Sequence, residues 1–235
     1  TSPGSTMRLL SSDNATVTLS LRTSDPLTLE TVTMRTAPTT VRTVRTSVPE
    51  DGAVTLRIGG FTKTIGPELD AAIAKAKASG AKRLVLDLRG SVGGPLERCL
   101  QTAARFTEGP IGSVERKTAG RLARTSLTVT PSGEQWTGPL AVIVDRTTLG
   151  TAEMLASALA TRNRAALVGS RTFGDGTEQN VLPLKDGSAI QLTTGKYYST
   201  DGVAFNTRGV TPRAPVADAS AQMAAALKAL RGARG

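Results

Sequence analysis

The sequence Arg83-Leu84-Val85-Leu86-Asp87-Leu88-Arg89-Gly90-Ser91-Val92-Gly93-Gly94 joins a short apolar run to a glycine-rich turn. An apolar run of this length, bounded by a turn, is typical of a strand inside a parallel sheet, so we expect a strand over 83–88. Apolar residues at helical spacing follow from Pro95 and predict a helix over 95–107. The stretch therefore predicts a strand, a tight turn and a helix in direct succession.

The same alternation of strands and helices continues on both sides of this stretch. It predicts a strand over 52–61, a helix over 64–79, and then a strand over 140–144, a helix over 151–161 and a strand over 165–169. Hydrophobic residues make up 39% of the chain and aromatic residues only 3%, so the core must be built from aliphatic side chains. We therefore expect an α/β fold with a mainly parallel sheet covered by helices.

The two ends of the chain have patterns of their own. Near the N-terminus, residues 15–21 and 27–34 alternate with period two around Ser24-Asp25-Pro26, which predicts a β-hairpin. Later in the chain, 179–184 and 188–194 predict a second hairpin, and 218–231 an amphipathic helix. We expect three parts: a β-hairpin segment over 1–46, a core over 47–217, and a C-terminal helix and tail over 218–235.

Composition and charge exclude several kinds of chemistry. The 235 residues contain no histidine, which excludes Ser–His–Asp and Cys–His catalysis and the usual zinc sites, so we expect neither a metal nor a cofactor. The single cysteine, Cys99, lies on an apolar helix face and is expected to be buried. The net charge is +10, but no nucleic-acid motif accompanies the scattered basic residues, and no apolar stretch is long enough to span a bilayer.

Two further segments follow predicted strands, as the glycine turn does. Thr147-Thr148-Leu149-Gly150-Thr151-Ala152-Glu153-Met154 comes after the strand over 140–144. Arg171-Thr172-Phe173-Gly174-Asp175-Gly176-Thr177-Glu178-Gln179 comes after the strand over 165–169. With the turn over 87–94, these segments resemble in order the core of the C-terminal processing peptidases, also called tail-specific proteases, which use a serine–lysine pair. The resemblance covers roughly residues 50–217.

The resemblance implies a fold, a compartment and a kind of partner. It implies a ClpP/crotonase-like β-α core, preceded in the family by a PDZ domain, of which residues 1–46 resemble only the last strands. It also implies a periplasmic, cell-envelope or secreted protein. The implied partners are unfolded or C-terminal peptide segments of other proteins, together with an active paralogue.

Two positions that carry the family's chemistry differ in this chain. Gly150 stands at the position of the nucleophilic serine, and Asp175 at that of the catalytic lysine. Gln179 matches the glutamine that orients the lysine, and an auxiliary acidic position falls on Thr161. The family's oxyanion hole is formed by backbone N–H groups, and it carries over to Gly93 or Gly94 and to Thr151.

Three hypotheses follow for the function. The leading one is a peptidase homologue that binds extended or C-terminal peptide segments but is catalytically silenced. The second is an active endopeptidase that uses Thr148 or Thr151 as its nucleophile. The third is a non-enzymatic binding or assembly module, in which the basic surface acts in place of the groove.

Overall fold

The structure is a computed structural model of the chain, and it describes residues 16–22, 29–37, 42–47 and 52–232. The chain divides into two compact units, one of residues 1–41 with 181–192, the other of 42–180 with 193–235. None of the described helices is long and apolar enough to cross a membrane.

An antiparallel hairpin forms the N-terminal part of the described chain. Strand β1 (Thr16–Arg22) pairs with β2 (Leu29–Arg35), with Thr16 opposite Arg35 and Arg22 opposite Leu29. This pairing confirms the two alternating strands expected there, whereas the predicted turn over 24–26 lies outside the described residues. Facing threonines, Thr18 and Thr33, lie 3.2 Å apart between their hydroxyl oxygens, as is common on the exposed face of a hairpin.

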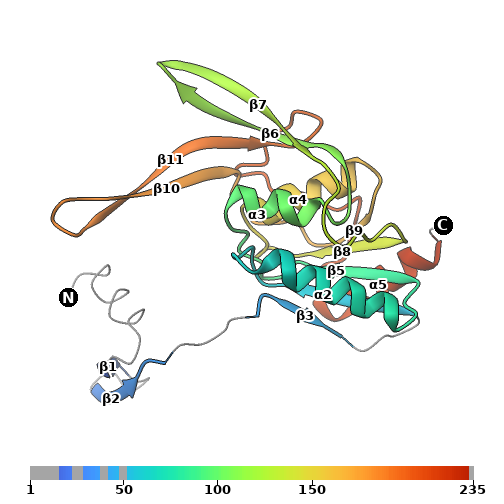
Figure 1. Ribbon diagram of the computed structural model, residues 1–235, viewed down its shortest axis with the longest axis horizontal. Coiled ribbons are helices and arrows are strands. Elements are labelled where there is room, and N and C mark those ends of the chain that lie inside the picture. The colour runs from blue at the N-terminus through green and yellow to red at the C-terminus, as the bar shows by residue number, and fades with distance from the viewer. Residues whose placement is uncertain (1–15, 23–28, 38–41, 48–51, 233–235) are drawn as a thin grey trace. The chain divides into compact units, whose positions relative to one another are not determined.

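A six-stranded sheet in the order β12-β9-β8-β5-β4-β3 forms the centre of the second unit (Figure 1). All neighbouring strands are parallel except β3, which runs antiparallel to β4. Parallel strands end at the same edge of a sheet, so the loops that follow β5, β8 and β9 meet there. The strands are β3 (Val44–Thr46), β4 (Ala53–Ile58), β5 (Arg83–Asp87), β8 (Leu140–Val144), β9 (Ala166–Gly169) and β12 (Ala214–Pro215).

Helices cover both faces of this sheet, which confirms the mixed α/β class. Leu84 and Leu86 of β5 belong to the same apolar cluster as α2, α3 and α4, whereas Val85 packs with α5 on the opposite face. The continuous apolar sequence of β5 follows from burial on both faces. The helices are α2 (Ile65–Ala78), α3 (Leu96–Ala103), α4 (Thr151–Thr161) and α5 (Ala219–Gly232).

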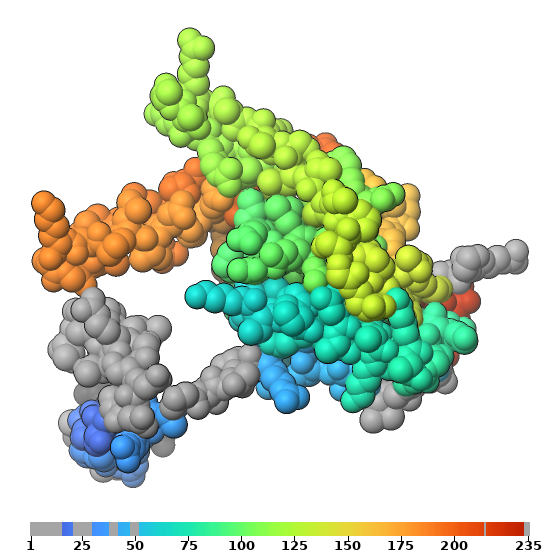
Figure 2. Space-filling model, in the orientation of Figure 1, coloured from blue at the N-terminus to red at the C-terminus, as the bar shows by residue number. Residues whose placement is uncertain are grey.

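A second sheet has the strand order β10-β11-β6-β7. The two strands expected over 179–184 and 188–194 are present, and the amide of Leu184 donates to the carbonyl of Ser188 at their turn (2.8 Å). Strands β6 and β7 form a long hairpin that stands out from the core (Figures 1 and 2). The bounds are β6 (Gly109–Thr118), β7 (Arg121–Val129), β10 (Thr177–Pro183) and β11 (Ala189–Tyr198).

The structure departs from the sequence-based expectations in three places. Residues 109–129, for which we predicted no element, form the β6–β7 hairpin. The helix expected over 95–107 ends at Ala103, and the next residues turn more tightly, with the Phe106 amide donating to the Ala103 carbonyl. Strand β3 joins the core sheet although its residues precede the expected start of the core at residue 47.

Candidate active site

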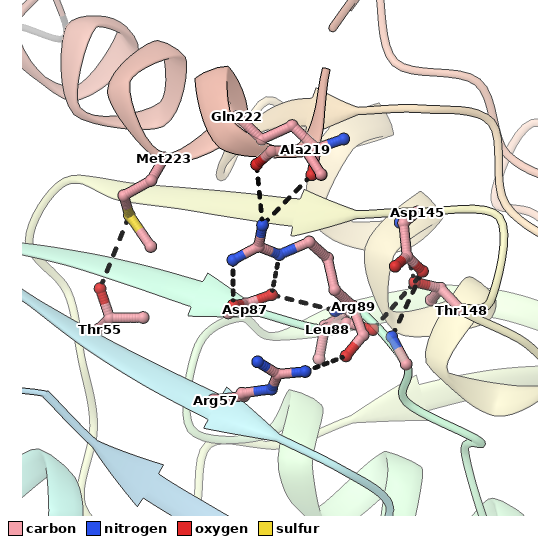
Figure 3. A network of polar contacts seen from close by, with 11 residues as sticks. Thr55, Arg57, Asp87, Leu88, Arg89, Asp145, Thr148, Ala219, Gln222 and Met223 are labelled. Carbon is pink, nitrogen blue, oxygen red and sulfur yellow. Dashed lines mark hydrogen bonds and ion pairs between the residues drawn. The ribbon is translucent and has the colours of Figure 1, made fainter. Parts of the chain in front are cut away.

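A network of polar contacts holds the end of β5 and the glycine turn that follows it (Figure 3). Arg89 donates two hydrogen bonds to the buried carboxylate of Asp87, from Nε (2.9 Å) and Nη2 (2.7 Å). The same guanidinium also donates to the carbonyl of Ala219 at the start of α5 (3.2 Å). Asp87 and Arg89 thus pair, and Arg89 attaches α5 to the sheet edge where the loops meet.

The glycines of the turn are required by close backbone contacts. A Cβ atom added to Gly94 would lie 2.3 Å from the carbonyl oxygen of Phe61, a distance that no side chain tolerates. Gly93 has φ +67°, and a Cβ there would lie 2.8 Å from the amide nitrogen of Thr151. The turn therefore packs backbone against backbone at the start of α4.

The Thr151 side chain fills part of the space between the glycine turn and α4. The amide of Gly94 donates to Thr151 Oγ1 (3.0 Å), and the Thr151 hydroxyl donates to the Gly94 carbonyl (2.9 Å). One expected oxyanion-hole donor is thus occupied within the chain. The amides of Gly93 and Thr151 have no hydrogen-bond acceptor among the described residues.

Gly150 precedes the first residue of α4 in an unusual backbone conformation. Its φ of 65° and ψ of −134° differ from those of ordinary strands and helices, and a nucleophile on a sharp strand-to-helix turn occupies a similarly strained position. An added Cβ would find only the Val92 carbonyl within 4 Å, at 3.6 Å. The position thus has room for a side chain but supplies no hydroxyl.

Glu153 is a buried carboxylate that connects the Gly150 turn with the loop after β9. It is 0% exposed and accepts hydrogen bonds from the amides of Gly150 (3.0 Å), Gly174 (2.7 Å) and Asp175 (2.8 Å), and from the hydroxyl of Thr172. Burial raises the pKa of Glu153 above its usual value, against the opposing effect of these hydrogen bonds. The sequence places Glu153 in the first turn of the helix expected over 151–161 but carries no signal for this connecting role.

Close packing extends the same connection to a loop near the end of the core. The amide of Val210 donates to Thr172 Oγ1 (2.7 Å), and a Cβ on Gly209 would lie 2.4 Å from the Thr172 carbonyl oxygen. We call Glu153, Thr172, Gly174 and Gly209 the buried frame. It fixes the backbone on both sides of the expected nucleophile and lysine positions.

A chain of hydrogen bonds links the residue at the lysine position to the expected glutamine. The Thr177 hydroxyl donates to Asp175 Oδ1 (2.7 Å), and Gln179 Nε2 donates to Thr177 Oγ1 (2.9 Å). Gln179 Nε2 also contacts Thr193 Oγ1 on β11 (2.8 Å). Thr177, the first residue of β10, therefore stands between Asp175 and Gln179; positions 177 and 179 share one face of the strand.

These residues border a cleft with a volume of about 440 Å³. Its walls include Gly94, Gly150, Thr151, Asp175 and Gln179, so five of the six expected site residues share one cavity; Gly93 is buried behind it. The lining contains no lysine, and the sequence has no histidine. The cleft thus offers backbone donors and carboxylates but no amine or imidazole.

A nearby lysine and the expected auxiliary acidic position both lie outside the cleft lining. Lys196 is exposed on β11, opposite Glu115 of β6. Thr161 lies at the last turn of α4 and donates to the carbonyl of Ser157 (2.9 Å). The described residues also contain no group of three or more His, Cys, Asp or Glu side chains that could hold a metal ion.

The sequence of this chain is similar to sequences of known proteins. A family model described as peptidase family S41 matches residues 53–216. Carboxy-terminal processing protease CtpA of Bacillus subtilis (strain 168) is 31% identical over 175 residues, which is 74% of this chain and 37% of that protein. The chloroplastic carboxyl-terminal-processing peptidase 1 of Arabidopsis thaliana is 34% identical over 158 residues, 67% of this chain and 32% of that protein. The chain spans about a third of the length of these curated relatives.

Solved structures resemble the fold. The photosystem II D1 C-terminal processing protease has a TM-score of 0.66 at 24% identity, and the match covers 87% of this chain and 56% of that protein's chain. A lipoprotein from Streptococcus agalactiae has a TM-score of 0.65 at 18% identity, over 81% of this chain and 70% of its own. At these identities the likeness concerns the fold alone.

Proposed function

Because this chain belongs to peptidase family S41, we propose that it binds extended peptide segments in the cleft beside Gly150 without cleaving them. The observation that carries the proposal is the backbone at Gly150, which has the sharp turn and the space for a nucleophile but no side chain. Acyl transfer by this class of enzyme needs a hydroxyl at that point.

The second missing group is the base. A serine–lysine mechanism needs a neutral amine within hydrogen-bond reach of the hydroxyl. Here the corresponding position carries the Asp175 carboxylate, which accepts a hydrogen bond from Thr177. Gln179 lies near this position, and among the described residues its side-chain amide donates to two hydroxyl oxygens, those of Thr177 and Thr193.

Neighbouring hydroxyl groups are poorly placed to replace the serine, which argues against the active-threonine hypothesis. Thr148 is 0% exposed, and its hydroxyl lies 2.9 Å from the Leu88 carbonyl to which it donates. Thr151 is 4% exposed, and its hydroxyl donates to Gly94. Ser91 is fully buried and does not line the cleft. All three hydroxyl groups are thus buried, and those of the two threonines donate to backbone carbonyls.

Peptide binding is supported by the groups that remain. Strand β10 lies at one edge of its sheet, and residues 177–180 of this strand line the cleft, so an extended segment can add to them through main-chain hydrogen bonds. The amide of Thr151, a residue that lines the cleft, suits a peptide carbonyl oxygen. Val92 and Leu96 supply apolar wall for a side chain. Peptide binding therefore requires neither the serine hydroxyl nor the lysine amine that this chain lacks.

The decisive experiment restores the two reacting groups. We expect no cleavage of an unfolded protein substrate by the natural chain, and measurable cleavage by the Gly150→Ser/Asp175→Lys double variant. Each single variant, Gly150→Ser and Asp175→Lys, should stay silent because each lacks one partner. Gly120→Ser is a matched control, because Gly120 also has positive φ (82°) and open space around its Cβ position but lies on the β6–β7 hairpin.

The outcome also separates the alternatives. Cleavage by the natural chain that survives in Gly150→Ala and is lost in Thr151→Val would overturn the proposal in favour of a threonine nucleophile. Fluorescence anisotropy of labelled unfolded peptides with the unmodified chain tests the second part of the proposal, which is peptide binding. Absence of binding to any unfolded segment would contradict it even if the double variant were silent.

The proposal extends to the rest of the protein. We assign residues 1–41, without β3 of the core sheet, to the end of a PDZ-like domain, because their described part contains a β-hairpin and the curated relatives are longer than this chain. We further propose that the protein acts in the cell envelope beside an active paralogue. Recovery of the full-length protein from an envelope fraction, in complex with a cleaving homologue, is the expected result of fractionation and affinity capture.

A further inference from the structure

A second hollow, with a volume of about 770 Å³, lies directly beside the cleft. Two of its lining residues, Val92 and Leu149, also line the cleft, so the two cavities share a wall. Its other side is formed by the loops after β8 and β9, which contribute Arg146, Arg171 and Phe173. A peptide that lies in the cleft can therefore continue into this space.

We propose that this basic hollow binds an acidic side chain of the peptide held in the cleft, and thereby selects segments that carry aspartate or glutamate beside an apolar residue. The inference rests on the proposed peptide binding and adds a substrate class to it. The basic hollow is the cavity lined by Arg146, Arg171, Phe173, Val92 and Leu149 with their neighbours.

The charge of the hollow carries the first part of the argument. Arg146 and Arg171 are both exposed, and neither makes an ion pair or side-chain hydrogen bond with any residue that the structure describes. No aspartate or glutamate is among the lining residues. Two guanidinium groups without a counter-charge at a concave site favour a carboxylate ligand.

Carboxylates lie nearby, but they are already used. Asp145 accepts hydrogen bonds from the Thr147 amide (2.9 Å) and hydroxyl (2.7 Å) and from the Gly90 amide (3.3 Å). Glu153 is held in the buried frame behind Thr172. Both carboxylates are therefore engaged within the protein, and the cleft carries a carboxylate of its own, Asp175, which has no ion-pair partner among the described residues. A peptide acid is thus drawn to the basic hollow and away from the cleft floor.

The backbone argues for a side-chain carboxylate over a C-terminal one. Chain termini are usually captured by a nest of free backbone amides. In the basic hollow, most lining amides already donate within the protein: those of Gly90, Val92, Thr147, Leu149, Ser170, Thr172 and Phe173. The arginine side chains are therefore the groups available to bind a carboxylate. Because they are long, they can reach the carboxylate of an Asp or Glu side chain, whose position varies more than that of a chain terminus.

Apolar surface at the mouth completes the site. Phe173 is 64% exposed and Val92 61%, and both line the basic hollow. Large exposed apolar side chains beside a polar pocket are typical of a peptide-binding surface. They supply a contact for the apolar residue next to the acid.

Fluorescence anisotropy with the whole chain tests the inference. The probes are fluorescein-labelled, C-terminally amidated decapeptides of Leu, Val and Ala with a single glutamate scanned along the sequence, each matched by a glutamine peptide. We expect the best glutamate position to lower Kd roughly five- to tenfold relative to glutamine. The preference should shrink at an ionic strength of about 0.5 M because exposed charges are screened.

Variants of the two arginines assign that preference. Arg146→Gln/Arg171→Gln should bind both members of a pair within about twofold of the natural chain's affinity for the glutamine peptide. The control, Lys117→Gln/Arg121→Gln, removes the same charge from the β6–β7 hairpin and should keep the preference. A preference that persists in the arginine variant, or disappears equally in the control, overturns the inference.

The remaining outcomes distinguish the inference from the proposed function. Equal binding of every glutamate and glutamine pair by the natural chain overturns the acidic subsite and leaves peptide binding intact. Failure of all peptides to bind overturns both. A gain from a free C-terminal acid over the amide, lost in the arginine variant, assigns the hollow to the chain terminus and rejects the side-chain assignment.

Discussion

The buried frame and the cleft in front of it use their polar groups very differently. In the frame, the Glu153 carboxylate accepts four hydrogen bonds, and Thr172 both donates and accepts. In the cleft, Gly150 has no side chain, and Asp175 contacts one neighbouring hydroxyl. The frame is held by several buried hydrogen bonds, whereas the side chains at positions 150 and 175 contribute almost none, so we expect the geometry of the site to depend on the frame.

The largest effect is expected at the centre of the frame. Glu153→Ala would leave three backbone amides without an acceptor in a buried position and would also open a cavity. We expect a loss of about 3–5 kcal/mol in the free energy of unfolding, measured by urea denaturation. A loss below about 1 kcal/mol would show that the frame does not hold the site.

A backbone contact in the frame should give a slightly smaller loss. Gly209 has φ +67°, and a Cβ there would lie 2.4 Å from the Thr172 carbonyl oxygen. We expect Gly209→Ala to cost about 2–4 kcal/mol through strain and displacement of that loop. Gly202→Ala is the control, because Gly202 also has positive φ (80°) but no atom within 4 Å of its Cβ position. Similar melting temperatures for the two variants would contradict the contact.

The titration of Glu153 should appear in the pH dependence of stability. Burial raises its pKa above the ordinary 4.5, so the folded chain binds this proton more tightly than the unfolded chain. The stabilising contribution is full below pH 4.5 and is lost as pH rises through the raised pKa. The unfolding free energy of the natural chain minus that of Glu153→Gln should therefore fall with rising pH. A rise would show that folding lowers the pKa of Glu153.

The smallest effect is expected on the cleft face. Asp175→Asn keeps an oxygen that can accept the Thr177 hydroxyl, and the side chain is only partly buried. We expect a change in unfolding free energy within about 0.5 kcal/mol. A loss comparable to that of the frame variants would erase the distinction between the two regions.

Much of the core could be predicted because its signals are local. Burial on both faces explains the continuous apolar run of β5, and the helices over 64–79 and 151–161 lie within one residue of their expected bounds at each end. The β6–β7 hairpin escaped prediction even though residues 121–129 carry an alternating pattern. It turns through Ala119 and Gly120, both at positive φ, and an alanine gives no sequence signal for such a turn.

The site residues could be located from the sequence, but their connections could not. Motif order brings Gly150, Asp175 and Gln179 to one cleft. The bond between Thr151 and Gly94, and the one between Thr172 and Val210, join residues far apart in the chain. Such contacts depend on the packing of loops and leave no periodic trace in the sequence. The basic hollow was missed for the same reason, because its two arginines come from different loops.

The hydrogen bond from Arg89 to Ala219 has a consequence for biosynthesis. It spans 130 residues and joins the segment before the glycine turn to α5, the last helix that the structure describes. Since a chain is synthesised from the N-terminus onward, this bond can form only after residue 219 has been made and has left the ribosome. A ribosome-bound chain that stops before residue 219 therefore lacks the anchor of its first site loop. The first loop of the site is thus fixed by a residue that is synthesised 130 positions later.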